Sequence, residues 1–184
     1  MSDILTELAD IGRARRIVLY GNPILRTAAA RIREITPEVL QLAADLKATL
    51  AVSEGIGLAA NQIGTAWSAF VLVPREADVD LPLTFIINPE IVATEGTVED
   101  EEGCLSIPGI FEVVNRPEMV IIRGIDLTGR EIRLETAGLL ARAVMHEYEH
   151  LQGKLFIDHL SELRRQLLRP RLMEIEQREK QQCG

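Results

Sequence analysis

Cysteine and long apolar runs are scarce in this sequence of 184 residues. The two cysteines, Cys104 and Cys183, are too few for a disulfide framework and favour a reducing setting. No apolar run approaches the roughly 18 residues that a membrane span requires. The N-terminus lacks the apolar core of a signal peptide, and its acidic residues Asp3, Glu7 and Asp10 argue against an organelle transit peptide. We therefore expect a cytoplasmic protein that makes no membrane contact.

Basic charge is also limited. The sequence has 20 Lys and Arg against 28 Asp and Glu, a net charge of −8, and its basic residues cluster only at 13–16. This balance argues against a nucleic-acid partner. There is no internal repeat, low-complexity tract or linker, so residues 1–184 are predicted to form one domain with a sizeable core. Residues 1–15 would be an N-terminal extension, and residues 161–184 a C-terminal helix and tail.

The pattern of elements predicts an α+β fold, in which antiparallel or mixed sheets of short strands pack around a central helix. Residues 1–15 suggest a helical or loose extension, and a long helix begins at Thr36 and Pro37. Its buried stripe would comprise Val39, Ala43, Leu46 and Leu50. Strands are expected at 17–20, 69–73, 83–87 and 90–94, and a hairpin at 120–126 and 131–135. Residues 99–101 suggest a solvated loop, and a last helix spans 162 to about 180, kinked or split at Pro170.

The chain is organised around residues 136–153, TAGLLARAVMHEYEHLQG. This segment predicts a buried helix, with Thr136 as its N-cap and Gly153 as its terminator. His146 and His150 are four positions apart, so they share one helix face and could bind one metal ion. Glu147 follows the first histidine, where a carboxylate can reach a metal-bound water. The alternative is two core histidines with backbone partners; the glutamate and the apolar surroundings favour the metal site.

A third ligand could come from Cys104, which follows a glycine in the stretch 99–108. A buried free cysteine is usually only a small apolar residue. One thiolate and two imidazoles, however, leave a fourth metal position to water, as catalytic sites do. Zinc, iron(II), cobalt and nickel would all accept this set.

Residues 55–64 contain three glycines, so the backbone of this loop can approach a ligand closely. The loop lacks the lysine and serine of a phosphate loop. Gln62 is its one side chain that could both donate and accept a hydrogen bond to a ligand. The loop could also be only a turn into the next strand.

Three motifs together resemble the peptide deformylase family. They are Gly-Ile-Gly-Leu-Ala-Ala-Asn-Gln at 55–62, Glu-Gly-Cys-Leu-Ser at 102–106 and His-Glu-Tyr-Glu-His at 146–150. Residues 18–26, with a Tyr-x-x-Pro-x-Leu-Arg pattern, are also similar to the start of the family, and the resemblance covers roughly residues 16–165. His-Glu-x-x-His alone is shared with many metallopeptidases, whereas its combination with a cysteine ligand is highly specific.

The resemblance implies a hydrolase that removes the formyl group from the N-formylmethionyl end of a new polypeptide and releases formate. A metal-bound water would attack the formyl carbon, and Glu147 would take its proton and pass it to the departing amine. The metal ligands would be Cys104, His146 and His150. The family commonly uses iron(II), while zinc, nickel or cobalt could replace it.

The other implied roles concern the substrate and the surroundings of the metal. Gln62 and the backbone N–H of Leu105 would bind the carbonyl oxygen, and Ile56 and Gly57 would pair with an extended peptide. Glu102 and Arg116 match family positions with supporting roles. Ile86 and Leu139 are candidates for an apolar pocket that takes the methionine side chain.

Three positions depart from the family pattern: Asn61 replaces the usual proline, Met145 a common glutamine and Glu149 the usual aspartate. No ligand or catalytic acid is missing, so we expect an active but divergent enzyme. We expect a monomer whose charged C-terminal helix could reach a partner such as the ribosome. The rivals are a metal hydrolase acting on another acyl group, and a protein that keeps its metal only for stability or binding.

Overall fold

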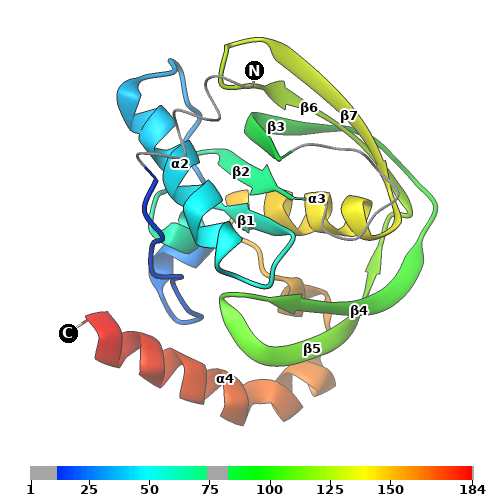
Figure 1. The fold of residues 1–184 in the computed structure, drawn as a ribbon. Coiled ribbons are helices and arrows are strands. Elements are labelled where there is room, and N and C mark those ends of the chain that lie inside the picture. The colour runs from blue at the N-terminus through cyan, green and yellow to red at the C-terminus, as the bar shows by residue number, and fades with distance from the viewer. Residues whose placement is uncertain (1–11, 74–82, 184) are drawn as a thin grey trace.

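The computed structural model describes residues 12–73 and 83–183 (Figure 1). The helices are α2 (Pro37–Ala51), α3 (Gly138–Leu151) and α4 (Glu162–Cys183), with short 3₁₀ turns η1 (Pro23–Arg26), η2 (Ala60–Ile63) and η3 (Phe156–His159). The strands are β1 (Gly57–Ala59), β2 (Ala69–Leu72), β3 (Thr84–Glu95), β4 (Val98–Cys104), β5 (Ile107–Arg116), β6 (Met119–Ile125) and β7 (Glu131–Ala137). The predicted α+β class is confirmed. Most of the predicted extension, residues 1–11, lies outside the described part.

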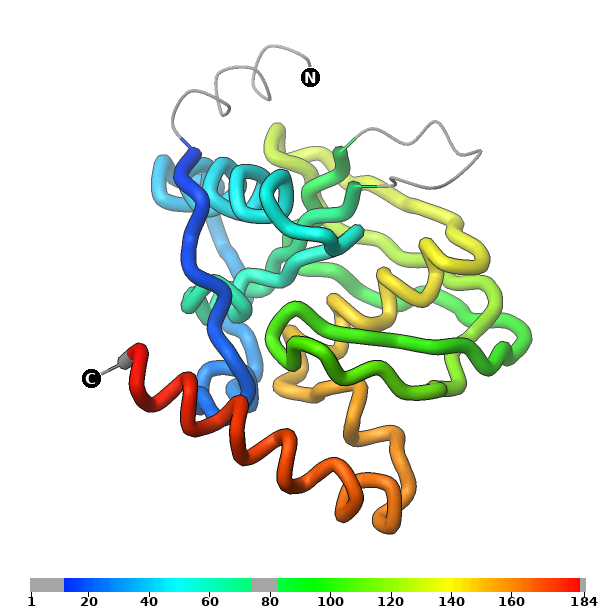
Figure 2. The backbone as a smooth tube through the Cα atoms, turned by 60° about the horizontal axis from the view of Figure 1, so that its bottom comes forward, coloured from blue at the N-terminus to red at the C-terminus, as the bar shows by residue number. Residues whose placement is uncertain are grey.

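The strands form two antiparallel sheets. One has the order β1-β2-β3-β6-β7, and the other is a ribbon of β4 and β5. Strand β2 shows how the layers are built, because its side chains alternate between two core clusters. Ala69 and Val71 pack in the cluster that contains α2, whereas Phe70 and Leu72 pack in the cluster that contains α3. The main sheet therefore lies between the two helices, and α3 lies between that sheet and the β4–β5 ribbon (Figures 1 and 2).

Helix α2 begins where the sequence predicts. Thr36 is its N-cap residue, Pro37 is the first helical residue, and the predicted stripe of Val39, Ala43, Leu46 and Leu50 is buried. Proline is favoured at this position because the N–H that it lacks would have no helical partner.

Helix α3 starts later than predicted. Thr136 is not its N-cap: it belongs to β7, and its hydroxyl donates to the carbonyl of Val120 across the β6–β7 pair. Ala137 precedes the first helical residue. The terminator is as predicted, since Gly153 has φ = 72° directly after the helix, a conformation that glycine adopts without strain.

Four other local predictions were wrong. Residues 17–20 form no strand; their backbone N–H groups bond instead to η2, the β4–β5 turn and α4. Residues 57–63 are not merely a loop but form β1 and η2. The two segments at 83–94 are one strand, β3, with a bulge where Asn88 adopts φ = 50°. Residues 99–101 are exposed, but they form no loop. They lie on β4, which pairs with a strand that was not predicted, β5.

Helix α4 is continuous through Pro170 and is not split. Leu168 precedes the proline, Leu172 and Ile175 follow it, and all three pack in one cluster with the chain start and β5. Contacts on both sides thus offset the lost backbone hydrogen bond.

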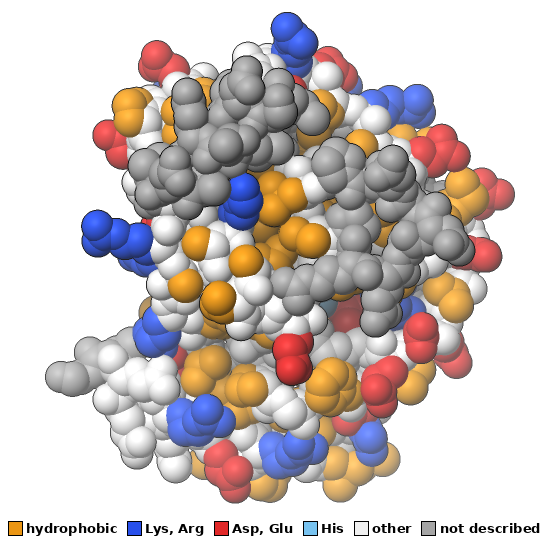
Figure 3. Space-filling model, in the orientation of Figure 1, with side chains coloured by type: hydrophobic (Ala, Val, Ile, Leu, Met, Phe, Trp, Pro, Cys, Tyr) orange, Lys and Arg blue, Asp and Glu red, His pale blue; other side chains and the backbone are white. Residues whose placement is uncertain are grey.

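The surface carries scattered charge. On the face in Figure 3, lysine and arginine side chains are spread singly among acidic ones and do not gather in one patch. Among the described residues, no helix is long and apolar enough to cross a membrane.

Candidate active site

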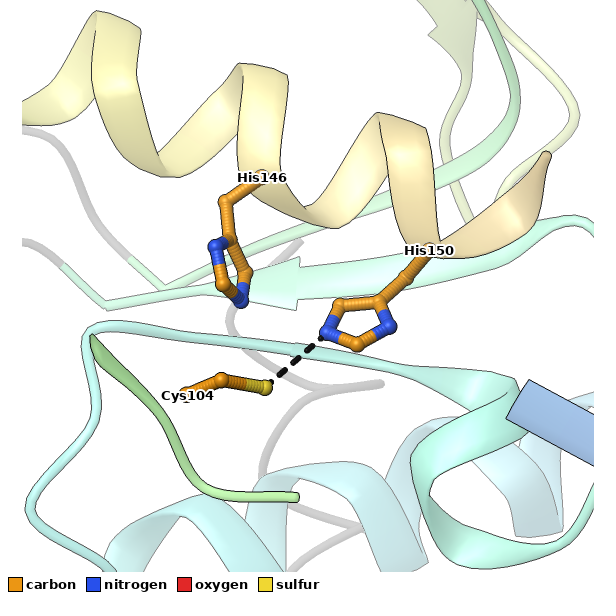
Figure 4. Close-up of side chains that lie close together, drawn as sticks. All are labelled: Cys104, His146 and His150. Carbon is orange, nitrogen blue, oxygen red and sulfur yellow. Dashed lines mark hydrogen bonds between the residues drawn. The ribbon is translucent and has the colours of Figure 1, made fainter. Parts of the chain in front are cut away.

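Cys104, His146 and His150 come together where the end of β4 meets α3. Their ligand atoms all lie within 4.8 Å of one another, and Cys104 Sγ is 3.2 Å from His150 Nε2. Figure 4 shows the thiol approaching from the end of β4 while both imidazoles project from α3. The two rings are 4.8 Å apart, as expected for side chains one helical turn apart.

The carboxylate of Glu102 fixes the orientation of His146. Its Oε1 is 2.7 Å from His146 Nδ1, which leaves Nε2 to face the thiol. Arg116 donates two hydrogen bonds to Glu102, at 2.7 and 2.9 Å, and Arg142 donates a third at 3.0 Å. Burial alone would raise the pKa of Glu102, but Arg116 and His146 lower it far below its usual value. Glu102 is therefore a permanent anion behind His146, and carboxylates in this position often orient metal-binding histidines.

The three residues fit a divalent cation. Burial opposes a charge on His146, yet Cys104 and Glu102 raise its pKa well above the usual value, so the metal-free ring holds a proton that a bound cation would displace. Burial and the neighbouring His146 instead lower the pKa of His150, which keeps that ring neutral. A thiolate and neutral imidazoles are the forms that bind borderline metals. These residues could hold one such ion.

Glu147 lies beside these groups and is 3% exposed. Its Oε2 has no hydrogen-bond partner among the described residues, so this oxygen remains available to exchange a proton. Burial, aided by Glu102 and opposed by His146, raises the pKa of Glu147 to about 7. A group that titrates near neutral pH can both accept and return a proton.

Gln62 faces the thiol from η2. Its Oε1 accepts a hydrogen bond from the backbone of Ala59 at 2.8 Å, so the acceptor of the amide is used locally. Its Nε2 lies 3.6 Å from Cys104 Sγ and 3.3 Å from Ser106 Oγ. Contrary to the expectation of a group with both functions free, Gln62 can offer a ligand only its donor. That polarity suits an oxygen that gains negative charge.

The extended segment 17–20 ties the two sides of this donor site together. The N–H of Val18 donates to the carbonyl of Gln62, and that of Tyr20 to the carbonyl of Ser106, both at 2.8 Å. These bonds hold η2 next to the turn that carries Leu105.

A cavity of about 470 Å³ opens onto these groups. Its wall includes Ile56, Gly57, Leu105 and Leu139, together with Gln62, Cys104, His146 and Glu147. Strand β1 is an edge strand, paired only with β2 among the described strands, so its other side can accept an extended peptide. The sequence-based placement of Ile86 is not supported: this residue is fully buried in the cluster around α3 and is not part of the cavity wall.

Comparisons with known proteins identify the family to which this site belongs. The family model for polypeptide deformylase matches residues 14–166. The chain belongs to the polypeptide deformylase family. The peptide deformylase of Syntrophobacter fumaroxidans is 42% identical over 153 residues, which are 83% of this chain and 90% of that protein. That of Acinetobacter baumannii is 44% identical over 170 residues, 91% and 96% of the two chains.

The fold agrees with this family. The crystal structure of peptide deformylase from Thermus thermophilus superposes with a TM-score of 0.82 at 36% identity, covering 90% of this chain and 99% of that one. Deformylases are metal-dependent hydrolases that remove the N-formyl group from an N-terminal formylmethionine, and this protein is such an enzyme.

The departures from the deformylase pattern lie close to the site. Glu149 forms an ion pair with Arg116 at 2.7 Å and contacts His159 at 2.8 Å, so its longer side chain still reaches a buried partner. Met145 packs against the cluster between α3 and the sheet. Asn61 is fully buried, and its amide donates to the backbone carbonyl of His150.

Sequence reasoning missed three residues of this region. Arg142 bonds to Glu102 and to two carbonyls of the β4–β5 ribbon, and Ser106 lies beside Gln62. His159 contacts Arg116 at 3.2 Å. Signals existed for Ser106, which lies in the motif at 102–106, and for Arg142, a charged residue one turn before His146 in the apolar first half of the helix.

Proposed function

We propose that this enzyme deformylates N-formylmethionyl peptides with Glu147 as general base and acid, and with Cys104, His146 and His150 as the ligands of one divalent ion. The observation that carries the proposal is the convergence of this donor set with a free Glu147 oxygen and the Gln62 amide. When bound, the ion would lower the pKa of water to near 7 and polarise the formyl group. The soft thiolate favours iron(II), and zinc, nickel or cobalt are the alternatives.

The protein groups divide the remaining work. The peptide adds as a strand along the free edge of β1, where Ile56 and Gly57 supply backbone hydrogen bonds. Its formyl oxygen accepts from Gln62 Nε2 and from the N–H of Leu105, donors that strengthen as this oxygen becomes negative. Glu147 takes a proton from the attacking water and delivers it to the departing amine. Leu139, which is half exposed at the cavity, contacts the methionine side chain.

The decisive experiment measures formate released from formyl-Met-Ala-Ser and acetate released from the acetylated peptide. We expect formate release to be much faster, because a formyl group is smaller than an acetyl group and approaches the metal site with less steric hindrance. In Glu147→Gln, formate release should fall by at least about 100-fold, the usual contribution of a general acid–base group, while bound metal is retained. Equal rates on the two peptides would favour a hydrolase of different acyl specificity. Unchanged activity in the variant would refute the role of Glu147.

We also propose that the enzyme acts as a cytoplasmic monomer and that the exposed, charged face of α4 contacts the ribosome transiently. Arg165 and Arg169 are exposed on this helix and could bind ribosomal RNA phosphates. Native mass should correspond to one chain, and co-sedimentation with ribosomes should weaken in Arg165→Ala/Arg169→Ala and at higher salt. If the amount of enzyme that co-sediments with ribosomes changed with neither the double variant nor the salt, the α4 contact would be refuted.

A further inference from the structure

Asn61 connects two elements of the active site, the turn η2 and the helix α3. It lies in η2 next to Gln62 and is fully buried. Its Nδ2 donates to the backbone carbonyl of His150 at 2.6 Å, across 89 residues of sequence. One side chain thus joins the turn that carries the Gln62 amide to the helix that carries the two histidine ligands.

The accepting carbonyl lies in the last turn of α3, where backbone carbonyls have no partner within the helix. It also accepts from the N–H of Gly153 at 3.0 Å. The fold therefore satisfies this carbonyl without Asn61, and the buried amide is not needed to cap the helix. What the amide adds is a fixed position of His150 relative to η2.

The other end of the amide indicates that this link has a cost. Asn61 Oδ1 is buried and has no hydrogen-bond partner among the described residues. A buried acceptor without a partner is destabilising, and an apolar side chain of similar shape would avoid this loss. A residue selected only for packing would not need an amide at this position.

We infer that Asn61 is a positioning residue for the ligand His150. By holding the backbone of His150 against η2, it sets the distance between the His150 imidazole, the Cys104 thiol and the Gln62 amide. This inference rests on the proposed metal site and extends it to a residue that touches neither metal nor substrate.

The test compares Asn61→Leu, of similar shape, with Asn61→Ala, using wild-type protein and Asn88→Ala as controls. Asn88 is also a buried amide that donates to a backbone carbonyl, that of Ile32 at 2.7 Å, but it lies on β3 away from the cavity wall. Each protein is stripped of metal and titrated with cobalt(II), whose absorption bands report on thiolate binding and ligand geometry. Formate release then gives kcat and KM separately.

For Asn61→Leu we expect cobalt affinity to fall about 10–100-fold and the bands to shift, because altered support of a ligand typically has this effect. The kcat should fall by a similar factor with KM nearly unchanged, and the melting temperature should move by less than about 4 °C. Asn61→Ala should lose the same affinity with a larger drop in melting temperature. Asn88→Ala should have a lower melting temperature but unchanged cobalt affinity and kcat.

The inference would be overturned if both Asn61 variants bound cobalt with an affinity within twofold of wild type and showed unchanged absorption bands. If wild-type protein itself bound no cobalt or released no formate, the proposed function would fail instead, so the two failures are distinguishable.

Discussion

Gly57 and the Glu147 carboxylate are packed so closely that no side chain fits between them. A Cβ at position 57 would lie 2.6 Å from Glu147 Oε1 and 2.8 Å from its Cγ. Gly57→Ala should therefore push the carboxylate aside while leaving the three metal ligands in place. Because displacement of a catalytic group by about 1 Å can reduce a rate about 100-fold, we expect a loss of this size in formate release, with unchanged metal content.

The double variant Gly57→Ala/Glu147→Gln identifies the cause of that loss. If alanine acts by moving Glu147, adding it to Glu147→Gln should reduce the remaining activity only slightly. If the activity losses of the two single variants instead multiplied in the double variant, alanine would act on the peptide-binding edge of β1 and not through Glu147.

The ionisation of Glu147 should also be visible in the stability of metal-free protein. Its pKa is raised from 4.5 to about 7, a shift that corresponds to roughly 3 kcal/mol. A raised carboxyl pKa means that the folded state prefers the protonated form. Its contribution is complete below about pH 4.5 and is lost as pH rises through about 7. Denaturant unfolding should therefore show Glu147→Gln gaining stability relative to the parent between these values. A stability difference that does not change with pH would contradict this shift.

At the residue scale, sequence reasoning succeeded where the chemistry is local. His146 and His150 are four positions apart, so their spacing alone predicts a shared face, and Glu147 follows the first of them directly. Arg142 and His159 were missed because their roles depend on Glu102 and Glu149, which lie in other segments. The pattern of a single segment contains no information on such partners.

Among the elements, α4 is held against residues 16–22 by hydrogen bonds to one buried carboxylate. Glu179, whose side chain is 3% exposed, accepts hydrogen bonds from both Arg16 Nη atoms at 2.6 and 3.0 Å. It also accepts from the N–H of Leu19 at 3.0 Å and from Asn22 Nδ2 at 2.8 Å. Losing one member of such a buried cluster leaves the others without compensation, so Glu179→Ala should lower the free energy of unfolding by about 3 kcal/mol.

Glu176→Ala provides the control, since Glu176 lies one turn before Lys180 on the same helix, is only half-buried and pairs with that exposed lysine. Loss of an exposed pair of this kind should cost less than about 0.5 kcal/mol. Equal losses in the two variants, measured by denaturant unfolding, would show that helix propensity and not the buried cluster explains the effect.

The element predictions failed where pairing is not local. Residues 17–20 have the composition of a strand, but their N–H groups bond to three separate elements, which only the assembled fold brings together. Strand β5 was missed because its exposed face is apolar at Phe111 and Val113, which obscures the usual alternation of apolar and polar residues. The prediction that Pro170 could split α4 failed for a similar reason, because the tertiary contacts that keep the helix continuous do not appear in its own sequence.

For the whole molecule, the three proposed ligands come from two parts that already share hydrogen bonds through Arg142 and His146. Cys104 ends the β4–β5 ribbon, whereas His146 and His150 belong to α3, which packs on the main sheet. An ion bound by all three would therefore add a crosslink between the ribbon and the helix that packs on the main sheet. Metal present at 100 to 1,000 times its dissociation constant should stabilise the fold by about 3–4 kcal/mol. For a chain of this length that corresponds to a rise of roughly 10 °C in melting temperature.

Removal of the metal should reverse this effect and expose the thiol. Treatment with a strong chelator should lower the melting temperature by about that amount. It should also speed alkylation of Cys104 by iodoacetamide, since the sulfur loses its metal bond and the ribbon loses its crosslink. The measurement uses a Cys183→Ser background, so that Cys104 is the only thiol. His150→Ala in that background is the control: it has only two of the ligands, so a chelator should change neither its melting temperature nor its alkylation rate by more than a small fraction of the parental effect. A parental protein equally insensitive to the chelator would show that no metal joins the two sheets.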